Sequence, residues 1–157
     1  TPSSIRGSYA GALGKPQFIS SSYRNYAVDF DGDNYADLWG SNADVIGSVA
    51  NYLKRNGWIR NGIILTDLDI KNPKLEKIAQ KTYKPHTKYK ELLNLDIKAP
   101  NKINHNEKLS VIKRIEGSDI IYSLGHNNFY TITRYNRSRL YALAVYTLAE
   151  EIIIHSK

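Results

Sequence analysis

Apolar residues recur at helical spacing in three segments of the chain. The first segment is predicted to begin a helix at Pro16, because proline is a favoured first helical residue. The second runs from about Ala43 to Asn56 and is closed by Gly57. Its apolar face comprises Val45, Ile46, Val49, Ala50 and Leu53. The third runs from Arg139 to Ile154 and carries a broad apolar stripe along the helix.

The pattern between the second and third helices is typical of short strands. Residues 63–68, 109–115 and 120–124 are strand-like, and a short helical run is predicted from Tyr89 to Leu95. Prolines interrupt the remainder. The pattern predicts an α+β fold, mainly α, in three parts: helical residues 1–66, a small mixed insertion at 67–125, and a returning helical part at 126–157.

Composition places the chain among folded soluble proteins. It has 157 residues, of which 41% are hydrophobic and 24% charged, enough for one core with a small subdomain. No apolar run reaches membrane-spanning length, so no transmembrane segment is expected. The absence of cysteine excludes disulfides and thiolate metal sites. Because the chain has no methionine and begins with Thr1, we expect a processed or cut end, with any targeting segment outside this sequence.

The positive charge is concentrated in the second part of the chain. Residues 1–66 carry six Lys and Arg against five Asp and Glu, whereas residues 67–157 carry sixteen against ten. Such a bias is compatible with binding to a polyanion. However, arginine is the better phosphate ligand, and the lysine-rich stretch at residues 71–114 contains only one arginine, Arg114. A solvated lysine-rich surface is therefore the favoured interpretation, and no nucleic-acid partner is predicted.

The most specific chemical feature is an acidic segment between the first two predicted helices. Asp29, Asp31 and Asp33 alternate around a tight turn, so that their oxygens can converge on a hard cation. Helix, acidic loop and helix is the layout of an EF-hand. A standard EF-hand loop has Gly at its sixth position and a bidentate Glu at its twelfth, whereas this loop has Asn34 and Gly40. A longer loop that borrows Asp44 restores the ligand count. We therefore favour a calcium site over a solvated acidic turn.

No self-contained catalytic constellation is evident. The four histidines lack metal-ligand spacing and are predicted to lie mostly on the surface. The chain has twelve tyrosines and three phenylalanines, a bias towards rings with a polar edge. Such rings stack on sugars, but half-buried core tyrosines are an equally good interpretation. The remaining candidates for a binding site are polar and aromatic residues in dense segments of the chain: Ser8, Gln17, Tyr52, Tyr135, Asn136 and Tyr141.

Four segments, in order along the chain, resemble the membrane-bound lytic murein transglycosylase B family. They are Arg6 to Tyr23, Tyr26 to Trp39, Asp44 to Tyr52 and Asn128 to Ala142, and only residues 67–125 resemble the family weakly. The resemblance implies a lysozyme-like helical fold with a small sheet-bearing insertion. It also implies cleavage of peptidoglycan glycan strands between N-acetylmuramic acid and N-acetylglucosamine, without water, in the periplasm or cell envelope. A lipid anchor, carried on an amino-terminal segment outside this sequence, is part of the same expectation.

The resemblance also implies roles for individual residues. Ser8 would orient a catalytic Glu, which protonates the leaving oxygen and then acts as base while a 1,6-anhydro ring closes. The residues that would line the sugar subsites are Gln17, Tyr52, Tyr135, Asn136 and Tyr141. Calcium would be held by the side chains of Asp29, Asp31, Asp33 and Asp44 and by the carbonyl of Tyr35.

Two departures from the family pattern are present. Lys15 and Pro16 stand where the family has an aromatic residue and a glycine. The segment that carries the family's catalytic Glu is not matched, so this chain is expected to be the carboxy-terminal portion of a transglycosylase and inactive alone. The enzyme hypothesis thus requires an amino-terminal part of the same protein. The alternative is a non-catalytic, calcium-stabilised module that binds glycan.

Overall fold

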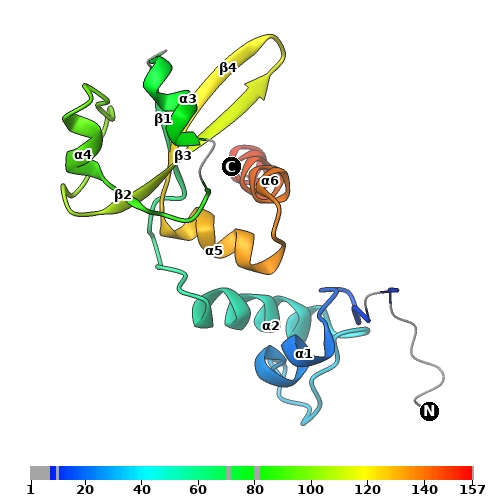
Figure 1. Cartoon of the computed structure of the whole chain (residues 1–157). Coiled ribbons are helices and arrows are strands. Elements are labelled where there is room, and N and C mark those ends of the chain that lie inside the picture. Colours follow the sequence, from blue (N-terminus) through cyan, green and yellow to red (C-terminus); the bar gives the residue numbers. More distant parts are fainter. Residues whose placement is uncertain (1–7, 10, 70–71, 80–81, 157) are drawn as a thin grey trace. The chain divides into compact units, whose positions relative to one another are not determined.

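The computed structural model describes residues 8–9, 11–69, 72–79 and 82–156 (Figure 1). The chain forms two compact units, Thr1–Asn56 and Gly57–Lys157. The boundaries at residues 66 and 125 that the sequence suggested remain a prediction.

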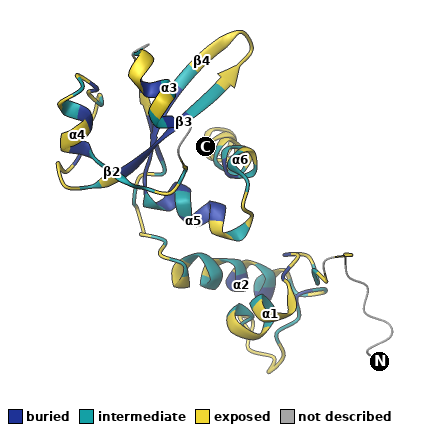
Figure 2. Ribbon diagram, in the orientation of Figure 1, coloured by how far each residue is buried: buried dark blue, intermediate teal, exposed yellow. Residues whose placement is uncertain are grey.

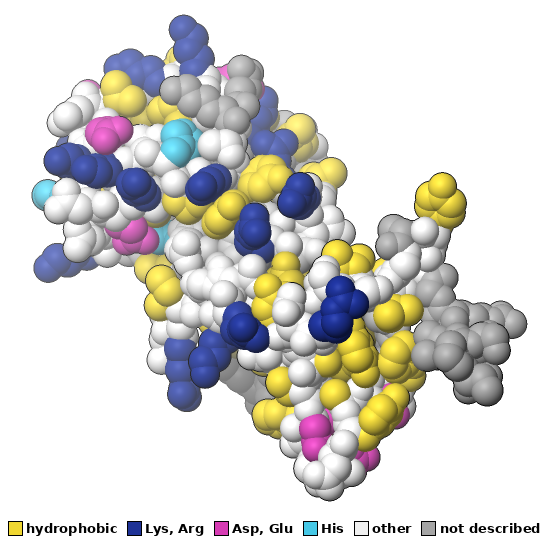
Figure 3. Space-filling view, turned by 60° about the horizontal axis from the view of Figure 1, so that its bottom comes forward, with side chains coloured by type: hydrophobic (Ala, Val, Ile, Leu, Met, Phe, Trp, Pro, Cys, Tyr) yellow, Lys and Arg dark blue, Asp and Glu magenta, His cyan; other side chains and the backbone are white. Residues whose placement is uncertain are grey.

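On the face drawn in Figure 3, Lys and Arg side chains lie singly or in small groups among uncharged ones, as a solvated basic surface would.

The first unit contains helices α1 (Ser20–Tyr26) and α2 (Asn42–Arg55), with the acidic loop between them. The predicted helix start at Pro16 is wrong. Leu13 and Phe18 instead pair as an antiparallel bridge, with N–H to O distances of 2.7 and 3.0 Å. Gln17 has a φ of 53°, so the turn from Gly14 to Gln17 excludes a helix there.

The core of the first unit is aromatic. Phe18 is only 2% exposed, and its ring centroid lies 6.5 Å from that of Tyr26 and 5.9 Å from that of Tyr52. The two tyrosine rings meet edge to face at 4.7 Å. Rings in such contact contribute about 0.5–1.5 kcal/mol per pair beyond the apolar area that they bury.

Helix α2 buries a different face from the one predicted. Its buried residues are Asp44, Gly47 and Ser48, whereas Ile46 is 68% exposed. A Cβ on Gly47 would collide with the ring of Phe30, so glycine permits the loop to pack closely there. The predicted end of α2 is confirmed, with Gly57 following at a φ of 100°.

The second unit is built on an antiparallel sheet in the order β1-β4-β3-β2. The strands are β1 (Leu65–Leu68), β2 (Thr87–Lys88), β3 (Lys108–Glu116) and β4 (Asp119–Gly125). The three strands predicted from sequence are confirmed. The two-residue strand β2 is too short to give a pattern. The helices are α3 (Pro73–Ala79), α4 (Tyr89–Leu93), α5 (Asn127–Tyr135) and α6 (Arg139–His155).

The sheet has a hydrophobic cluster on each face. Figure 2 shows the buried residues of the strands and of the helices beside them in dark blue. Successive strand residues point to opposite faces, so Val111 packs with the cluster of α3 and α4. The next residue, Ile112, packs with Phe129 of α5 and Ala142 of α6. The sheet therefore holds α5 and α6 on one face and the two short helices on the other.

Helix α6 is confirmed, but its predicted apolar stripe is mostly not buried. Ala142 is its buried residue, while Leu140 is 73% exposed and Leu148 is 61% exposed. The side chains that pack against the sheet come from its first half: Tyr141, Leu143, Val145 and Tyr146. Within the described part of the chain, no helix combines the length and the apolar character needed to cross a membrane.

Candidate functional site

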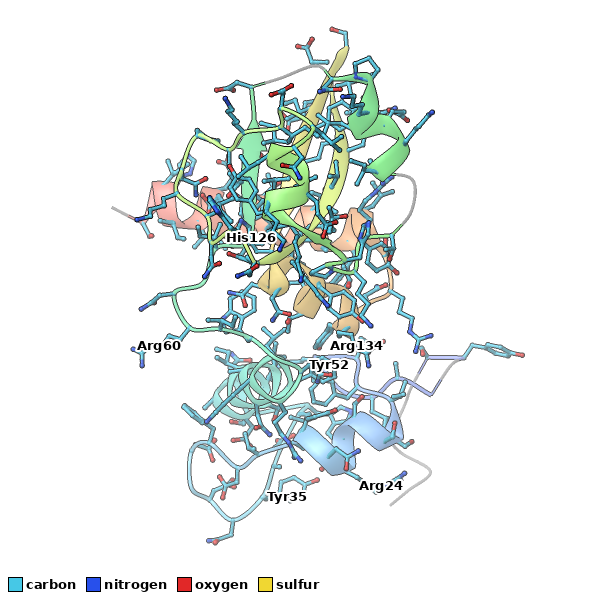
Figure 4. The ribbon with its side chains drawn as sticks, turned by 60° about the vertical axis from the view of Figure 1, so that its left-hand side comes forward. Arg24, Tyr35, Tyr52, Arg60, His126 and Arg134 are labelled. Atoms are coloured by element: carbon cyan, nitrogen blue, oxygen red, sulfur yellow. The ribbon has the colours of Figure 1, made fainter. Side chains whose placement is uncertain are left out.

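The acidic loop is held together by its own carboxylates. Asp29 accepts hydrogen bonds from the backbone N–H of Gly32 at 2.6 Å and of Asn34 at 2.8 Å. Asn34 has a φ of 70°, the left-handed conformation expected at the sixth loop position. Tyr35, labelled on this loop in Figure 4, is 59% exposed, and its N–H donates to Asp33 at 2.9 Å.

Asp44 joins the loop to the start of α2. It is fully buried, and its carboxylate accepts the N–H of Phe30 and of Asp37, both at 2.7 Å. These donors, above all the Phe30 N–H, lower the pKa of the Asp44 carboxyl below its ordinary value, although burial acts in the opposite direction. Ser41 caps α2 by accepting the N–H of Asp44 at 3.2 Å.

Three of the four predicted carboxylate ligands come together. Oxygens of Asp29, Asp31 and Asp44 all lie within 4.8 Å of one another. Asp33 is not part of this group, and its carboxylate oxygen instead accepts the N–H of Tyr35. The inclusion of Asp44 agrees with the longer loop that the sequence suggested.

The twelfth loop position, Gly40, lies against the side chain of Asp37. A Cβ on Gly40 would collide with the carboxylate of Asp37. Asp37 in turn accepts the N–H of Gly40 at 2.9 Å and of Trp39 at 2.8 Å, and these bonds lower the pKa of its carboxyl. The sequence alone did not reveal this role, although an Asp two or three residues before Gly is a common turn signal.

The predicted glycan-binding residues fall in two groups, one on each unit. In the first unit, Ser8 is exposed and its Oγ accepts the N–H of Ala12 at 3.1 Å. Gln17 is exposed in its turn, where its Nε2 donates to the carbonyl of Gly14 at 2.9 Å. Tyr52 is half-buried in the aromatic cluster described above.

In the second unit, three predicted residues meet where α5 ends and α6 begins. The rings of Tyr135 and Tyr141 are stacked, with centroids 6.4 Å apart and planes 2° from parallel. Asn136 caps the end of α5 and is exposed. The Tyr141 N–H donates to the Ser138 Oγ at 3.2 Å, which fixes the first turn of α6.

The expectation of surface histidines is wrong for His126. This side chain is 4% exposed and bridges two partners across the second unit. Its Nδ1 lies 2.7 Å from Glu107 Oε1, and its Nε2 lies 3.0 Å from Thr66 Oγ1. No spacing in the sequence links these three residues, because the pairing of β4 with β1 brings Thr66 to His126 and the pairing of β4 with β3 brings Glu107 there.

A family model for the transglycosylase SLT domain matches residues 1–150. The chain belongs to the transglycosylase SLT domain family. It is 36% identical over 153 residues to membrane-bound lytic murein transglycosylase B of Escherichia coli, covering 98% of this chain and 41% of that protein.

Solved structures of transglycosylases have the same fold. Catenated lytic transglycosylase SltB1 from Pseudomonas aeruginosa matches with a TM-score of 0.93 and 39% identity, covering 100% of this chain and 52% of that one. Escherichia coli Slt35 in complex with calcium matches with 0.85 and 34%, covering 99% and 48%. Pseudomonas aeruginosa SltB3 in complex with NAG-NAM-pentapeptide matches with 0.74 and 33%, covering 92% and 39%.

These matches confirm the family that the sequence resembled and the α+β, lysozyme-like fold class with its small sheet-bearing part. The chain spans about half the length of the SltB1 and Slt35 chains.

Lys15, which the sequence comparison above marked as a departure from the expected pattern, has a structural role in this transglycosylase domain. Lys15 donates from Nζ to Asn42 Oδ1 at 2.7 Å and to the Gly40 carbonyl at 3.4 Å. It therefore ties the turn before Gln17 to the end of the acidic loop and the first residue of α2. No local sequence pattern predicts this contact, because Lys15 and Asn42 are 27 positions apart.

Proposed function

We propose that this chain is part of a lytic transglycosylase that cleaves the glycan strands of peptidoglycan. The main support for this proposal is that the family model matches residues 1–150 and that the whole chain superposes on SltB1 with a TM-score of 0.93. A fold alone would not support a function. Here the 36% identity to a membrane-bound murein transglycosylase extends over nearly the whole chain, including both groups of predicted site residues.

The proposed reaction breaks the bond between N-acetylmuramic acid and N-acetylglucosamine without water. A Glu outside the matched segments donates its proton to the leaving oxygen. It then takes the proton of the muramyl C6 hydroxyl, whose oxygen bonds to C1 and closes a 1,6-anhydro ring. One carboxylate thus performs the work that two share in most glycoside hydrolases.

Ser8 is proposed as the residue that orients this Glu. Its Oγ accepts the Ala12 N–H, which leaves the hydroxyl hydrogen to be donated to a carboxylate. The proposed sugar-binding residues are Gln17, Tyr52, Tyr135, Asn136 and Tyr141. Stacked tyrosines such as Tyr135 and Tyr141 offer flat apolar faces with hydroxyl edges, which suit the alternating apolar and polar surface of a sugar.

A full-length enzyme with this activity should convert purified peptidoglycan into muropeptides that end in 1,6-anhydromuramic acid. Because no water enters the products, digestion in H₂¹⁸O should leave them unlabelled, and mass spectrometry measures both properties. Lysozyme, a hydrolase, serves as the control that incorporates the label. Reducing, ¹⁸O-labelled ends from this enzyme would overturn the transglycosylase assignment in favour of hydrolysis.

We also propose that the acidic loop binds calcium as an EF-hand-like site. Calcium takes oxygen ligands at about 2.3–2.6 Å, so two ligands of one ion lie at most about 5 Å apart. The 4.8 Å cluster of Asp29, Asp31 and Asp44 oxygens fits this requirement. Asp33 and the carbonyl of Tyr35 are the further proposed ligands. A cation would neutralise three carboxylates that otherwise repel one another, and so would stabilise the loop and both flanking helices.

Calcium should raise the thermal unfolding temperature of the protein, and Asp31→Asn should abolish that increase. Asp31 has a side-chain bond from Ser41 Oγ at 2.6 Å that an amide oxygen retains, so its loss of charge acts mainly on the ion. A ligand present at 100 times its Kd stabilises the folded state by about 2.7 kcal/mol. Differential scanning fluorimetry in calcium and in chelator measures the effect.

The matched variant is Asp44→Asn, which should unfold at a lower temperature even in chelator. Its carboxylate accepts two loop N–H groups at 2.7 Å, and an amide can replace only one of these acceptors. Equal unfolding temperatures of the unmutated protein in calcium and in chelator would contradict the calcium site.

A calcium-stabilised module that binds glycan without cutting it is the second candidate. The observation in its favour is that Glu76, Glu107 and Glu116 are each bonded to a basic side chain. Either function places the protein in the cell envelope, where peptidoglycan lies, and the membrane-bound Escherichia coli relative supports this location.

A further inference from the structure

A cavity of about 700 Å³ lies within the second unit, apart from the tyrosine pair and Asn136. Three elements supply its charged and polar lining: the segment before β2, the start of β3 and the first turn of α5. The lining includes Lys84, Glu107, Lys108, His126, Asn127 and Tyr130. None of these is a predicted glycan-binding residue, so the cavity has no role in the function proposed above.

One wall of the cavity is fixed before any ligand binds. Asn128 is 1% exposed and donates from Nδ2 to the carbonyls of Ile59 and Gly62 at 2.8 and 2.9 Å. Its Oδ1 accepts the Ile59 N–H at 2.8 Å. Asn127 Nδ2 donates to the Gly57 carbonyl at 2.6 Å. The loop at residues 57–62 is thus bonded to the start of α5, which gives the cavity a preorganised side.

A second wall is fixed through His126, which Figure 4 labels in this unit. The buried imidazole holds Glu107 at 2.7 Å on one side and Thr66 at 3.0 Å on the other. Glu107 has a side-chain exposure of 37%, so the part not bonded to His126 remains accessible. It offers a fixed acceptor for N–H groups of a ligand.

The cavity also carries cationic groups at its edge. Lys84 and Lys108 are both exposed at its edge, and neither forms an ion pair with any residue that the structure describes. Two ammonium groups beside one carboxylate favour a ligand that has carboxylates as well as N–H donors. A peptide has this combination of groups, whereas an uncharged sugar does not.

We propose that this cavity binds the peptide stem carried by muramic acid, with Lys84 and Lys108 binding its carboxylates and Glu107 its N–H groups. The inference rests on the proposed function, since it assumes that a glycan lies at Tyr135 and Tyr141. Helix α5 separates the two places, and its nine residues span about 13 Å. A pentapeptide extends to about 17 Å, so a stem attached to that glycan is long enough to reach the cavity.

The test compares two ligands and two double variants of the full-length protein by calorimetry. The ligands are GlcNAc-MurNAc-pentapeptide and the same disaccharide without its peptide, neither of which contains the bond that the enzyme is proposed to cleave. The cavity variant is Lys84→Gln with Lys108→Gln. The control is Lys98→Gln with Lys102→Gln. These substitutions remove the same charge, but from two exposed lysines outside the cavity.

The cavity variant should raise the Kd of the peptide-bearing ligand roughly fivefold, as expected for two lost exposed ion pairs. Its Kd for the bare disaccharide should not change, and the control variant should bind both ligands like the unmutated protein. Equal Kd values for the two double variants would overturn the peptide site and leave glycan binding intact. If the unmutated protein binds neither ligand, the proposed function itself fails.

Discussion

The 157-residue chain alone should release no 1,6-anhydromuropeptides from peptidoglycan, whereas the full-length protein should release them. Cleaving a glycosidic bond requires a proton on a poor leaving group, and general acid catalysis contributes about 10²–10⁴ in rate. Positioning of the reacting groups contributes further. If the acid is supplied from outside this chain, as proposed, the product of the chain alone should be undetectable, and not merely slower to appear.

The expectation follows from where the described carboxylates lie. Glu76 is bonded to Lys113 Nζ at 2.9 Å and to the Tyr122 hydroxyl at 2.6 Å. Arg114 forms ion pairs with Asp67 and Glu116 at 2.7 and 2.8 Å. The aspartates of the acidic loop accept backbone N–H groups of the loop itself. Each of these carboxylates thus already has a hydrogen-bond or ion-pair partner among the described residues.

The measurement is chromatography and mass spectrometry of soluble products from the two proteins at equal concentration. Sedimentation with insoluble peptidoglycan should show that the short chain still binds, which separates lost chemistry from lost folding. Anhydro products from the short chain would prove that one of its own carboxylates is the acid. Glu107, which lines the cavity beside His126, would then be the first to replace by Gln.

Sequence patterns predicted the longer regular elements of the second unit. The strands at β3 and β4 and the long helix α6 are of this kind. The helix expected at Pro16 failed because two bonds between Leu13 and Phe18 close a turn there, and the left-handed Gln17 prevents the helical path. Turn chemistry overrode a favourable apolar spacing.

In the candidate site, too, the sequence predicted contacts between nearby residues better than contacts between residues far apart in the chain. The alternating aspartates of the acidic loop are a local signal, and three of the four predicted carboxylates converge. On α2, Gly47 packs against the ring of Phe30 and Asp44 accepts the Phe30 N–H, and helical periodicity represents neither contact. His126, Glu107 and Thr66 meet only through strand pairing, so the spacing of residues in one sequence gives no indication of that network.

The second large effect is expected from Tyr141→Ala in the full-length enzyme. This change should lower kcat/KM about tenfold to hundredfold, a loss of about 1.4–2.8 kcal/mol in transition-state binding. The ring of Tyr141 is stacked parallel to that of Tyr135, and so positions a second aromatic face as well as its own. Turnover of peptidoglycan by purified variants measures the effect.

Two controls separate glycan contact from stability. Tyr141→Phe keeps the ring that packs against Tyr135 and against the hydrophobic cluster of Phe129 and Ala142. It should therefore retain most of the stacking contribution and lose only a hydroxyl contact. Leu148→Ala removes a side chain that is 61% exposed on the same helix and should leave activity unchanged. A Tyr141→Ala enzyme with full activity and an unchanged unfolding temperature would exclude Tyr141 from the sugar subsites, because the loss of a stacking ring in contact with substrate cannot be neutral.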